Sequence, residues 1–327
     1  MLAQRLAEAP YLLADGATGT NLFDMGLANG EAPELWLDQH PDRIAALHRA
    51  FVEAGADIIL TNSFGANARR LALHGLQHRA RELNRIAASI AREVADAGAR
   101  RIVVAGSVGP TGDLLAPLGP LTEAETVEVF AEQMAGLREG GADLAWIETM
   151  SAPEEMRAAA SAAARIGLPW TLTASFDTAG RTMMGLAPDA FTSFAASLPT
   201  APLGLGANCG VGAADLVVSL LAMDSAIPII AKANAGVPVV QGDQVIYSGT
   251  PRIMEAYAHL ALDAGARIVG GCCGTTPAHL AAMRQGMDHH HRGPRPEIAA
   301  IIAALGPLMQ PPPAIGAERR TNRRRSA

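Results

Sequence analysis

The chain has 327 residues and a formal net charge of −6 at pH 7, which is enough length for one large barrel or two average domains. Hydrophobic residues make up 49% of it, so the chain can bury a sizeable core and is not expected to be disordered. No apolar run reaches the length of a membrane span and no secretory signal precedes Tyr11, so no membrane association is predicted. Only three cysteines occur, two of them adjacent, which argues against a disulfide framework and indicates a reducing cytoplasm.

The charge is distributed unevenly along the chain. Residues 292–327 contain seven Arg and two Glu, a net of 7 − 2 = +5, which leaves −6 − 5 = −11 for residues 1–291. A body with this much negative charge is not expected to bind nucleic acid. Lys232 is the only lysine among the 26 basic Lys and Arg residues, which we attribute to overall composition rather than to chemistry.

Short apolar runs alternate with amphipathic segments along the chain. We expect strands at residues 11–15, 57–61, 101–105, 143–147, 169–175, 202–207, 227–231 and 266–269. After a short leading helix, we expect helices at 41–54, 78–97, 122–139, 153–165, 188–197, 213–223, 250–264 and 277–287. The last of these should begin with Thr276 as its N-cap and Pro277 in its first position. Because the strands are almost wholly apolar, both of their faces should be covered, as in a parallel sheet.

Eight such units predict an α/β fold, a (β/α)8 TIM barrel, rather than an open doubly wound sheet. No Gly-x-Gly-x-x-Gly follows the first strand, which disfavours a nucleotide-binding fold. We assign residues 1–291 to the barrel and residues 292–327 to a Pro/Arg-rich C-terminal extension that is partly disordered. This extension should contain a short apolar helix near 297–305 and a solvated Arg319–Arg325 run.

Distinctive polar residues lie at the expected C-terminal ends of the strands, which share one face in a barrel. They are Asp15, Asn62, Ser107, Glu148, Cys209, Asn234, Cys272 and Cys273. The strands that carry the cysteines flank the strand at 227–231, so the three thiols can converge. Neighbouring side chains on a strand point to opposite faces, so Cys272 and Cys273 meet only where the chain leaves the strand, a turn that their flanking glycines permit.

Three thiolates at one point suit a catalytic zinc ion, which takes three protein ligands and keeps one position open. Zinc held by three thiolates is a poor generator of hydroxide, but it lowers the pKa of a fourth, exchangeable thiol and keeps it as a nucleophile. That is the requirement for alkyl transfer to sulfur. A structural zinc normally has four protein ligands at C-x₂₋₄-C spacing, which is absent here. Inert buried thiols are the other alternative.

Several motifs together resemble the homocysteine S-methyltransferase family, whose members include betaine-, S-methylmethionine- and cobalamin-dependent enzymes. They are Asp15-Gly-Ala-Thr-Gly-Thr, Thr61-Asn-Ser-Phe, Gly106-Ser-Val-Gly-Pro, Ile147-Glu-Thr, Asn208-Cys-Gly and Gly270-Gly-Cys-Cys-Gly-Thr-Thr-Pro. The resemblance implies a (β/α)8 barrel with Zn²⁺ on Cys209, Cys272 and Cys273. It also implies that Asp15 and Glu148 hold the amino group of homocysteine. Asn234 resembles an asparagine that some members place near the metal when substrate is absent.

The residue types are compatible with these roles. Carboxylates at two strand ends suit an ammonium group, and backbone N–H groups around Gly16 and Ala17 can receive the carboxylate of the same amino acid. The alternatives are a capping role for Asp15 and a buried ion pair for Glu148. For Asn62 and Asn234 the alternative is a turn-forming role.

Betaine is the methyl donor that we expect first, ahead of S-methylmethionine and other sulfonium compounds. Aromatic faces bind quaternary ammonium groups, and animal betaine enzymes of the family carry two tyrosines for this purpose. The positions of this chain that resemble them are Gly65 and Thr149, which are not aromatic. A different cage would use aromatic residues elsewhere, for which the candidates are Trp36, Phe64, Trp146 and Phe176.

Two further functions stay open. We expect no cobalamin- or folate-binding domain in this chain, so a separate methylcobalamin protein can supply the methyl group instead. A zinc- and thiol-binding sensor or scaffold on the same barrel is the non-enzyme alternative. A homo-oligomer is compatible with either.

Overall fold

The computed structural model describes residues 1–241 and 244–310. Eight parallel strands form one sheet in the order β1-β10-β7-β6-β5-β4-β3-β2. They are β1 (Leu12–Leu13), β2 (Ile58–Leu60), β3 (Val103–Val108), β4 (Leu144–Met150), β5 (Trp170–Ala174), β6 (Leu205–Cys209), β7 (Ile229–Ala233) and β10 (Ala266–Gly271). A parallel bridge between Ala14 and Ile58 joins the two ends of the sheet. The predicted (β/α)8 barrel is thereby confirmed.

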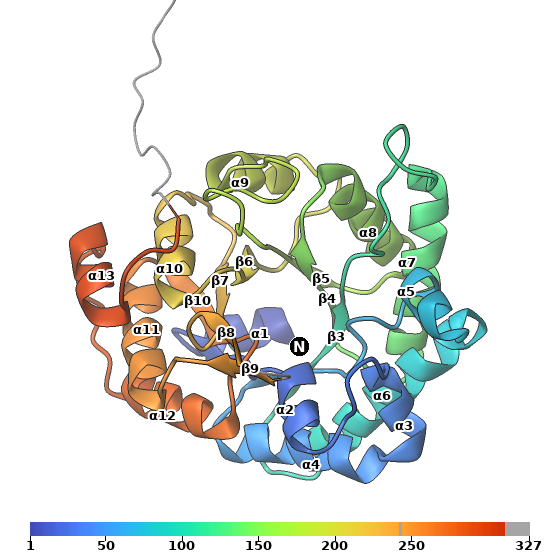
Figure 1. The fold of residues 1–327 in the computed structure, drawn as a ribbon, viewed down its shortest axis with the longest axis horizontal. Helices are drawn as coiled ribbons and strands as arrows, with labels where there is room; N and C mark the ends of the chain where they lie inside the picture. The colour runs from blue at the N-terminus through green and yellow to red at the C-terminus, as the bar shows by residue number, and fades with distance from the viewer. Residues whose placement is uncertain (242–243, 311–327) are drawn as a thin grey trace, which may run out of the picture.

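The helices form a ring around the strands (Figure 1). Those that alternate with the strands are α4 (Pro41–Glu53), α6 (Ala80–Asp96), α7 (Glu123–Glu139), α8 (Pro153–Ile166), α9 (Pro188–Ala196), α10 (Ala213–Leu221), α11 (Pro251–Asp263) and α12 (Pro277–Asp288). Shorter helices lie in the loops after β1 and β2, namely α2 (Gly19–Asp24), α3 (Trp36–Gln39) and α5 (Ala68–Leu71). None of the helices in the described part of the chain is long and apolar enough to cross a membrane.

Local signals in the sequence account for where several helices begin. Thr122 and Glu125 form a reciprocal capping box at the start of α7. At the start of α12, Thr276 is the N-cap as predicted, and its N–H donates to Nδ1 of His279 (3.1 Å). The other ring nitrogen of His279 lies 2.9 Å from the carbonyl oxygen of Gly249, which ties this helix to the segment that follows β7.

Apolar side chains fill the interior of the barrel. This inner core contains Leu12, Ala14, Ile58, Leu60, Val103, Ala105, Leu144, Trp146, Ile230 and Ile268. Leu2 of α1 (Leu2–Glu8) joins the same cluster, and α1 lies across the middle of the ring (Figure 1). With its interior filled, the barrel leaves room for a site among the loops at the C-terminal ends of the strands.

Five of the barrel strands, β3, β4, β6, β7 and β10, end later than the sequence pattern indicates. β4 continues to Met150 and β7 to Ala233, so Glu148 and Lys232 lie within strands. A two-stranded antiparallel sheet, β8 (Pro238–Gln241) and β9 (Gln244–Tyr247), follows β7 and was not predicted.

Part of the assigned C-terminal extension packs on the barrel. α13 (Ile298–Leu305) forms where a short helix was predicted, and it packs against α10 and α11. The N–H groups of Met309 and Gln310 both donate to the carboxylate of Asp215 (3.0 Å each). Residues 311–327, with the Arg319–Arg325 run, lie outside the described residues.

Candidate active site

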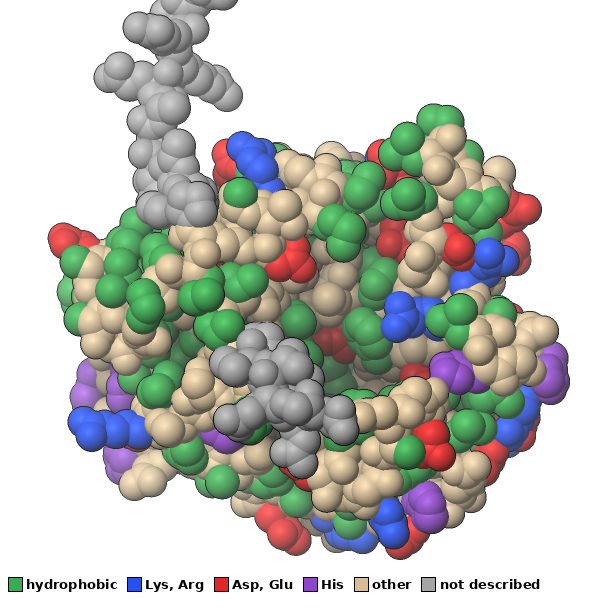
Figure 2. Space-filling view, viewed as in Figure 1, with side chains coloured by type: hydrophobic (Ala, Val, Ile, Leu, Met, Phe, Trp, Pro, Cys, Tyr) green, Lys and Arg blue, Asp and Glu red, His purple; other side chains and the backbone are tan. Residues whose placement is uncertain are grey.

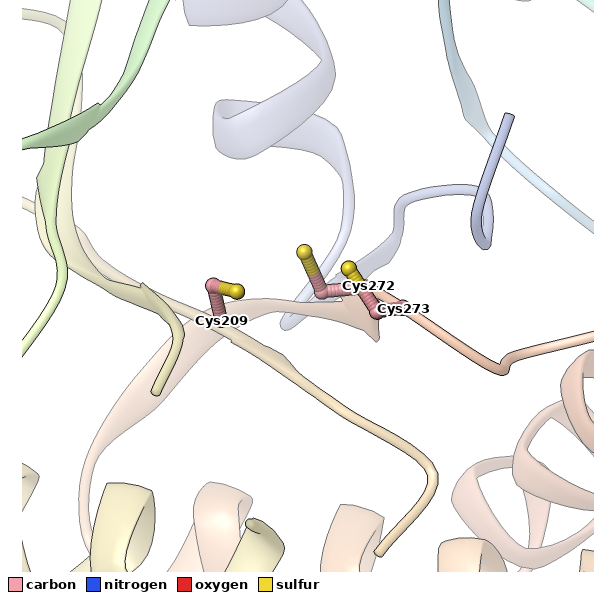
Figure 3. Close-up of side chains that lie close together, drawn as sticks. All are labelled: Cys209, Cys272 and Cys273. Carbon is pink, nitrogen blue, oxygen red and sulfur yellow. The ribbon is translucent and has the colours of Figure 1, made fainter. Parts of the chain in front are cut away.

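The three cysteines meet where β6 and β10 leave the sheet on either side of β7. Cys209 and Gly271 both pair in register with Ala233, and the N–H of Cys272 donates to the carbonyl of Ala233 (2.7 Å). Cys209 adopts a left-handed conformation (φ 62°), which takes it out of the regular alternation of the strand. The three sulfur atoms lie within 4.8 Å of one another (Figure 3). The convergence predicted from the sequence is confirmed.

Two asparagines hold loops near this cluster. The Oδ1 of Asn234 accepts a hydrogen bond from the N–H of Cys273 (3.0 Å), and its Nδ2 donates to the carbonyl of Gly210 (2.7 Å). Asn234 thereby joins the two cysteine loops. Asn62 donates to the carbonyl of Pro33 (2.8 Å), which ties the loop after β2 to the segment before α3. Both side chains link segments that are far apart in the sequence, and contact with metal or substrate stays a prediction for each.

The chemistry of the sulfur atoms fits a divalent cation. The hydrogen bond with Cys272 lowers the pKa of Cys209, but the contact with Cys273 and burial outweigh it and raise that pKa to about 12. Three thiolates this close repel one another unless a positive charge lies between them. A soft dication that prefers sulfur, such as Zn²⁺, supplies that charge and takes three such ligands with one position open.

A cavity of about 500 Å³ opens above the cysteines. Figure 2 shows it as the hollow at the middle of this face. Its walls include Gly16, Ala17, Phe23, Glu34, Asn62, Phe64, Gly65, Arg70, Ser107, Glu148, Thr149, Cys209, Lys232, Cys272 and Cys273. The structure therefore brings all the predicted site residues except Asp15 and Asn234 to the wall of one cavity. Asn234 contacts that wall through Cys273, and Asp15 contacts it through Lys232.

Glu148 is a buried carboxylate on this wall. Its Oε1 accepts a hydrogen bond from the hydroxyl of Ser107 (2.6 Å). Burial raises the pKa of Glu148, an effect that the charge of Lys232 and the Ser107 hydroxyl oppose and the charge of Asp15 reinforces. Within the described residues, no Lys, Arg or His nitrogen lies within 4 Å of this carboxylate.

Asp15 forms a buried ion pair with Lys232, and the sequence analysis missed that lysine. The Nζ of Lys232 lies 2.9 Å from Oδ1 of Asp15, and the other carboxylate oxygen accepts a hydrogen bond from the N–H of Leu60 (2.7 Å). Lys232 is only 2% exposed, yet it borders the cavity. The scarcity of lysine can still reflect composition, but this one lysine has a structural role, because it is buried, pairs with a predicted site carboxylate and borders the cavity.

The turn after Asp15 needs its glycine. A Cβ at Gly16 would lie 2.7 Å from the carbonyl oxygen of Thr275, closer than such atoms approach. The N–H of Ala17 donates to that same oxygen (3.1 Å). This N–H is therefore engaged within the protein, and the N–H of Gly16 is the better candidate for a substrate carboxylate.

The aromatic candidates for a donor cage are dispersed. The guanidinium of Arg43 lies over the ring of Trp36, which meets His40 edge-on, and Phe176 packs against Phe191. Trp146 lies in the barrel interior beneath Lys232, with Nζ 5.8 Å from its ring centre. Of the four candidates, Phe64 borders the cavity. These four residues do not form a shared aromatic cage in this structure.

A carboxylate and a guanidinium occupy the wall beside Phe64 instead. The N–H of Gly65 donates to Oε1 of Glu34 (2.8 Å), and a Cβ at Gly65 would lie 2.8 Å from that oxygen. Glu34 thus takes the space that a larger residue at position 65 needs. The guanidinium of Arg70 lies 5.9 Å from the ring centre of Phe64 and borders the same cavity. No motif in the sequence pointed to Glu34 or Arg70.

Comparison with known proteins decides the family. The family model "Homocysteine S-methyltransferase" matches residues 12–287. The chain belongs to the homocysteine S-methyltransferase family. The match covers every strand of the barrel and all three cysteines, and it confirms the resemblance drawn from the motifs.

Some relatives of this chain are much longer than the chain itself. The methionine synthase of Mycobacterium tuberculosis (strain ATCC 25618 / H37Rv) is 31% identical over 349 residues, an alignment that covers 98% of this chain and 28% of that protein. The methionine synthase of Mycobacterium leprae (strain TN) is 30% identical, with the same coverage. The chain thus spans little more than a quarter of the length of these relatives.

Solved structures of a homocysteine methyltransferase share the fold. The metallated form of MmuM from Escherichia coli superposes with a TM-score of 0.72 at 24% identity, covering 87% of this chain and 99% of that one. The oxidized form of the same protein gives a TM-score of 0.70 at 26% identity, covering 86% and 99%.

Proposed function

We propose that this protein is a zinc-dependent homocysteine S-methyltransferase that forms methionine, with betaine as the first donor to test. One observation carries the proposal: three cysteine sulfurs converge at a cavity that a buried carboxylate, Glu148, also borders. The three sulfurs suit a metal ion that activates a substrate thiol, and Glu148 suits the ammonium group of an amino acid.

Cys209, Cys272 and Cys273 would hold the zinc ion. When bound, the ion would keep the homocysteine sulfur as a thiolate at neutral pH. The metallated MmuM structure supports a metal in this family. The chain's own residues then have to orient the amino acid and exclude competing thiols.

Glu148 and the loop after β1 are placed to orient homocysteine. Glu148 reaches the cavity from the end of β4 with its Oε1 held by Ser107, so its carboxylate has a fixed position from which to accept an ammonium. The N–H of Gly16 is our candidate for the carboxylate of the same molecule. Asp15 supports this arrangement from beneath through its pair with Lys232.

Charges on the outer wall support a zwitterionic onium donor. Glu34 offers a carboxylate toward a cationic methyl-bearing head group, Phe64 offers a ring face, and Arg70 offers a partner for the donor carboxylate. The homocysteine sulfur attacks a donor methyl carbon, so an S–C bond forms and the N–C bond of betaine breaks. The bonding electron pair stays on nitrogen, which leaves as the neutral amine of dimethylglycine, and no general acid is needed.

A separate methylcobalamin protein is the second candidate donor. Two observations favour it: the four aromatic candidates do not form a cage, and methionine synthases that match the whole chain are more than three times its length. In that case the outer wall of the cavity faces a protein partner instead of a small molecule.

A donor screen separates these possibilities. Zinc-loaded protein is incubated with homocysteine and, in parallel, betaine, S-methylmethionine or free methylcobalamin, and methionine is measured by mass spectrometry. We expect methionine with betaine and without cobalamin. Formation only with methylcobalamin would refute the small-donor proposal, and stoichiometric homocysteine binding with no turnover on any donor would favour a sensor.

The metal assignment has its own test. The three-thiolate site predicts about one zinc per chain, measured by elemental analysis, and its loss when any one of Cys209, Cys272 or Cys273 is replaced by Ala. The variant Ser63→Ala is the matched control, because Ser63 borders the same cavity but does not belong to the three-cysteine cluster. Single variants that keep full zinc and full activity would show that the site is misassigned.

A further inference from the structure

Lys232 places a positive charge inside the barrel directly below the cavity. Its neighbour two residues back, Ile230, belongs to the inner core, so alternation along β7 turns Lys232 inward as well. Its Nζ donates to Oδ1 of Asp15 (2.9 Å) and to the carbonyl oxygen of Asp15 (3.1 Å), and it lies over the ring of Trp146. Lys232 therefore fixes both the side chain and the backbone of Asp15.

The charges around this lysine can be counted. Two carboxylates, Asp15 and Glu148, and one ammonium, Lys232, are buried together, which gives −2 + 1 = −1. Within the described residues the ion pair joins Lys232 to Asp15, while the side-chain hydrogen bonds to Glu148 come from a hydroxyl and an amide. The charge of Glu148, on the cavity wall, is thus left without a cationic partner.

The lysine stays charged in these surroundings. Burial alone would lower the pKa of Lys232, but the charges of Asp15 and Glu148 and the hydrogen bond to Asp15 outweigh burial and raise it. A charged Lys232 also explains how two carboxylates can be buried near each other in an apolar barrel.

We infer that Lys232 determines the acceptor specificity of the site: it neutralises Asp15, so that Glu148 alone holds an uncompensated charge and the site selects thiols that carry one ammonium group. The inference rests on the proposed function and changes the roles that the resemblance implies, because Asp15 and Glu148 no longer share the substrate ammonium. Asp15 and Lys232 are positioning residues, and Glu148 is the contact. A thiol without the ammonium would leave the charge of Glu148 buried and unpaired.

A charge-rescue experiment tests this division of roles. The probes are homocysteine and 4-mercaptobutyrate, which has the same thiol and carboxylate but no amino group. Dissociation constants are measured by calorimetry on the zinc-loaded wild type, Asp15→Asn, and the double variant Asp15→Asn/Lys232→Met. The net charge of the three positions is −1 in the wild type, 0 in the single variant and −1 again in the double variant.

We expect the wild type to prefer homocysteine by roughly 30-fold or more, because an unpaired buried charge is costly in a binding site. Asp15→Asn should lose most of this preference, since Lys232 then compensates Glu148. Removing Lys232 as well should restore it. Zinc content and circular dichroism confirm that each variant is folded, and the double variant replaces a buried ion pair by neutral groups, a change that proteins often tolerate.

Each outcome is informative. A double variant with a preference no better than that of Asp15→Asn would overturn the inference, because a structural role for Lys232 predicts further damage instead of rescue. A wild type that binds both thiols equally well would overturn it too, while leaving the zinc and thiol chemistry in place. A zinc-loaded wild type that binds no homocysteine would overturn the proposed function and this inference together.

Discussion

Glu148 and Glu155 show how surroundings assign different roles to two buried carboxylates. Glu148 borders the cavity and has one oxygen held by Ser107. Glu155 lies outside the cavity lining, and its Oε1 accepts from the N–H and the hydroxyl of Thr111 (2.7 and 2.6 Å). Burial raises the pKa of both carboxyl groups, so burial alone does not distinguish a substrate contact from a loop anchor.

This contrast gives a matched pair of variants. Glu148→Gln should weaken homocysteine binding by about 2–5 kcal/mol while leaving zinc content unchanged, because the side chain meets the ammonium and not the metal. Glu155→Gln should leave homocysteine affinity near that of the wild type. Calorimetry and elemental analysis measure the two quantities. Zinc loss in Glu148→Gln, as large as that in the cysteine variants, would mean that Glu148 supports the metal centre.

His48 predicts a pH dependence of stability. It is fully buried in α4, its Nε2 has no partner among the described residues, and burial lowers its pKa from 6.5 to about 4. Between these values the unfolded chain binds a proton that the folded protein does not, so this contribution to stability is present above pH 6.5 and is lost as the pH falls toward 4.

From pH 7 to pH 5 the free energy of unfolding should therefore fall by about 2 kcal/mol because of this residue. Urea unfolding of the wild type and His48→Leu at both pH values measures the effect. Between pH 7 and pH 5, the free energy of unfolding of His48→Leu should fall by about 2 kcal/mol less than that of the wild type. Equal losses in the two proteins would show that other groups cause the acid sensitivity.

The sequence predicted the cysteines and Glu148 because their motifs are distinctive, and it missed residues whose importance depends on neighbours. Lys232 carried one signal, a lysine between Ala231 and Ala233 at a position that alternates with Ile230, but we ended the strand one residue too early to use it. Glu34 carried none. Its place beside Gly65 arises from packing between two loops that are adjacent only in the folded chain.

At the scale of elements, two glycines follow cysteines in similar conformations but different surroundings. Gly210 has φ 77° with open space around it, whereas Gly274 has φ 76° and packs against Tyr247 of β9. A Cβ at Gly274 would overlap the Tyr247 ring. Gly274 is therefore where the β8–β9 hairpin contacts the loop of Cys272 and Cys273.

Alanine at each glycine separates backbone strain from this contact. Both substitutions should cost about 1 kcal/mol through the left-handed conformation. Gly274→Ala should lower the stability of the protein further than Gly210→Ala does. It should also weaken zinc binding, because the added Cβ displaces either Tyr247 or the cysteine loop. Thermal unfolding and chelator competition measure the two effects. Identical results for both variants would show that the hairpin does not support the metal centre.

The positions of the elements were predictable, but their ends and additions were not. Apolar runs located the eight barrel strands because buried parallel strands are apolar on both faces. The antiparallel pair of β8 and β9 was missed. The sequence Gly242-Asp243 is nevertheless a turn signal, because it separates two short runs that mix apolar and polar residues. Cys209 and Thr149 have positive φ, a conformation that only tertiary contacts impose on such residues.

At the scale of the whole molecule, Asp57 fastens the closure of the barrel. Its side chain accepts hydrogen bonds from the N–H of Leu13 (3.0 Å) and from Arg5 (2.8 Å), and Arg284 lies 3.3 Å away. These partners come from β1, α1 and α12, which are the first and last parts of the ring.

Asp57→Ala should therefore destabilise the whole barrel by about 3 kcal/mol, because it leaves a buried backbone N–H without its acceptor and removes one carboxylate partner from each of two guanidinium groups. Glu128→Ala, which removes an exposed ion pair with Arg165, should cause no measurable change. Urea unfolding of both variants measures the difference. A loss in Asp57→Ala as small as that in the control would mean that β1 and β2 are held by their backbone contacts alone.

The join between β1 and β10 also governs when the site comes into existence. Leu12 pairs with Ile268 there, and the residues just beyond this pair are Asp15 and Gly16 on one side and Cys272 and Cys273 on the other. A chain interrupted before β10 keeps one of the three sulfurs and lacks Gly271, Cys272 and Cys273 of the cavity wall. Ligands that bind where β1 and β10 meet therefore bind only after the barrel has closed. Their binding free energy adds to the stability of the folded barrel. Under the proposed function, metal occupancy of the three-cysteine site would in this sense report completed folding.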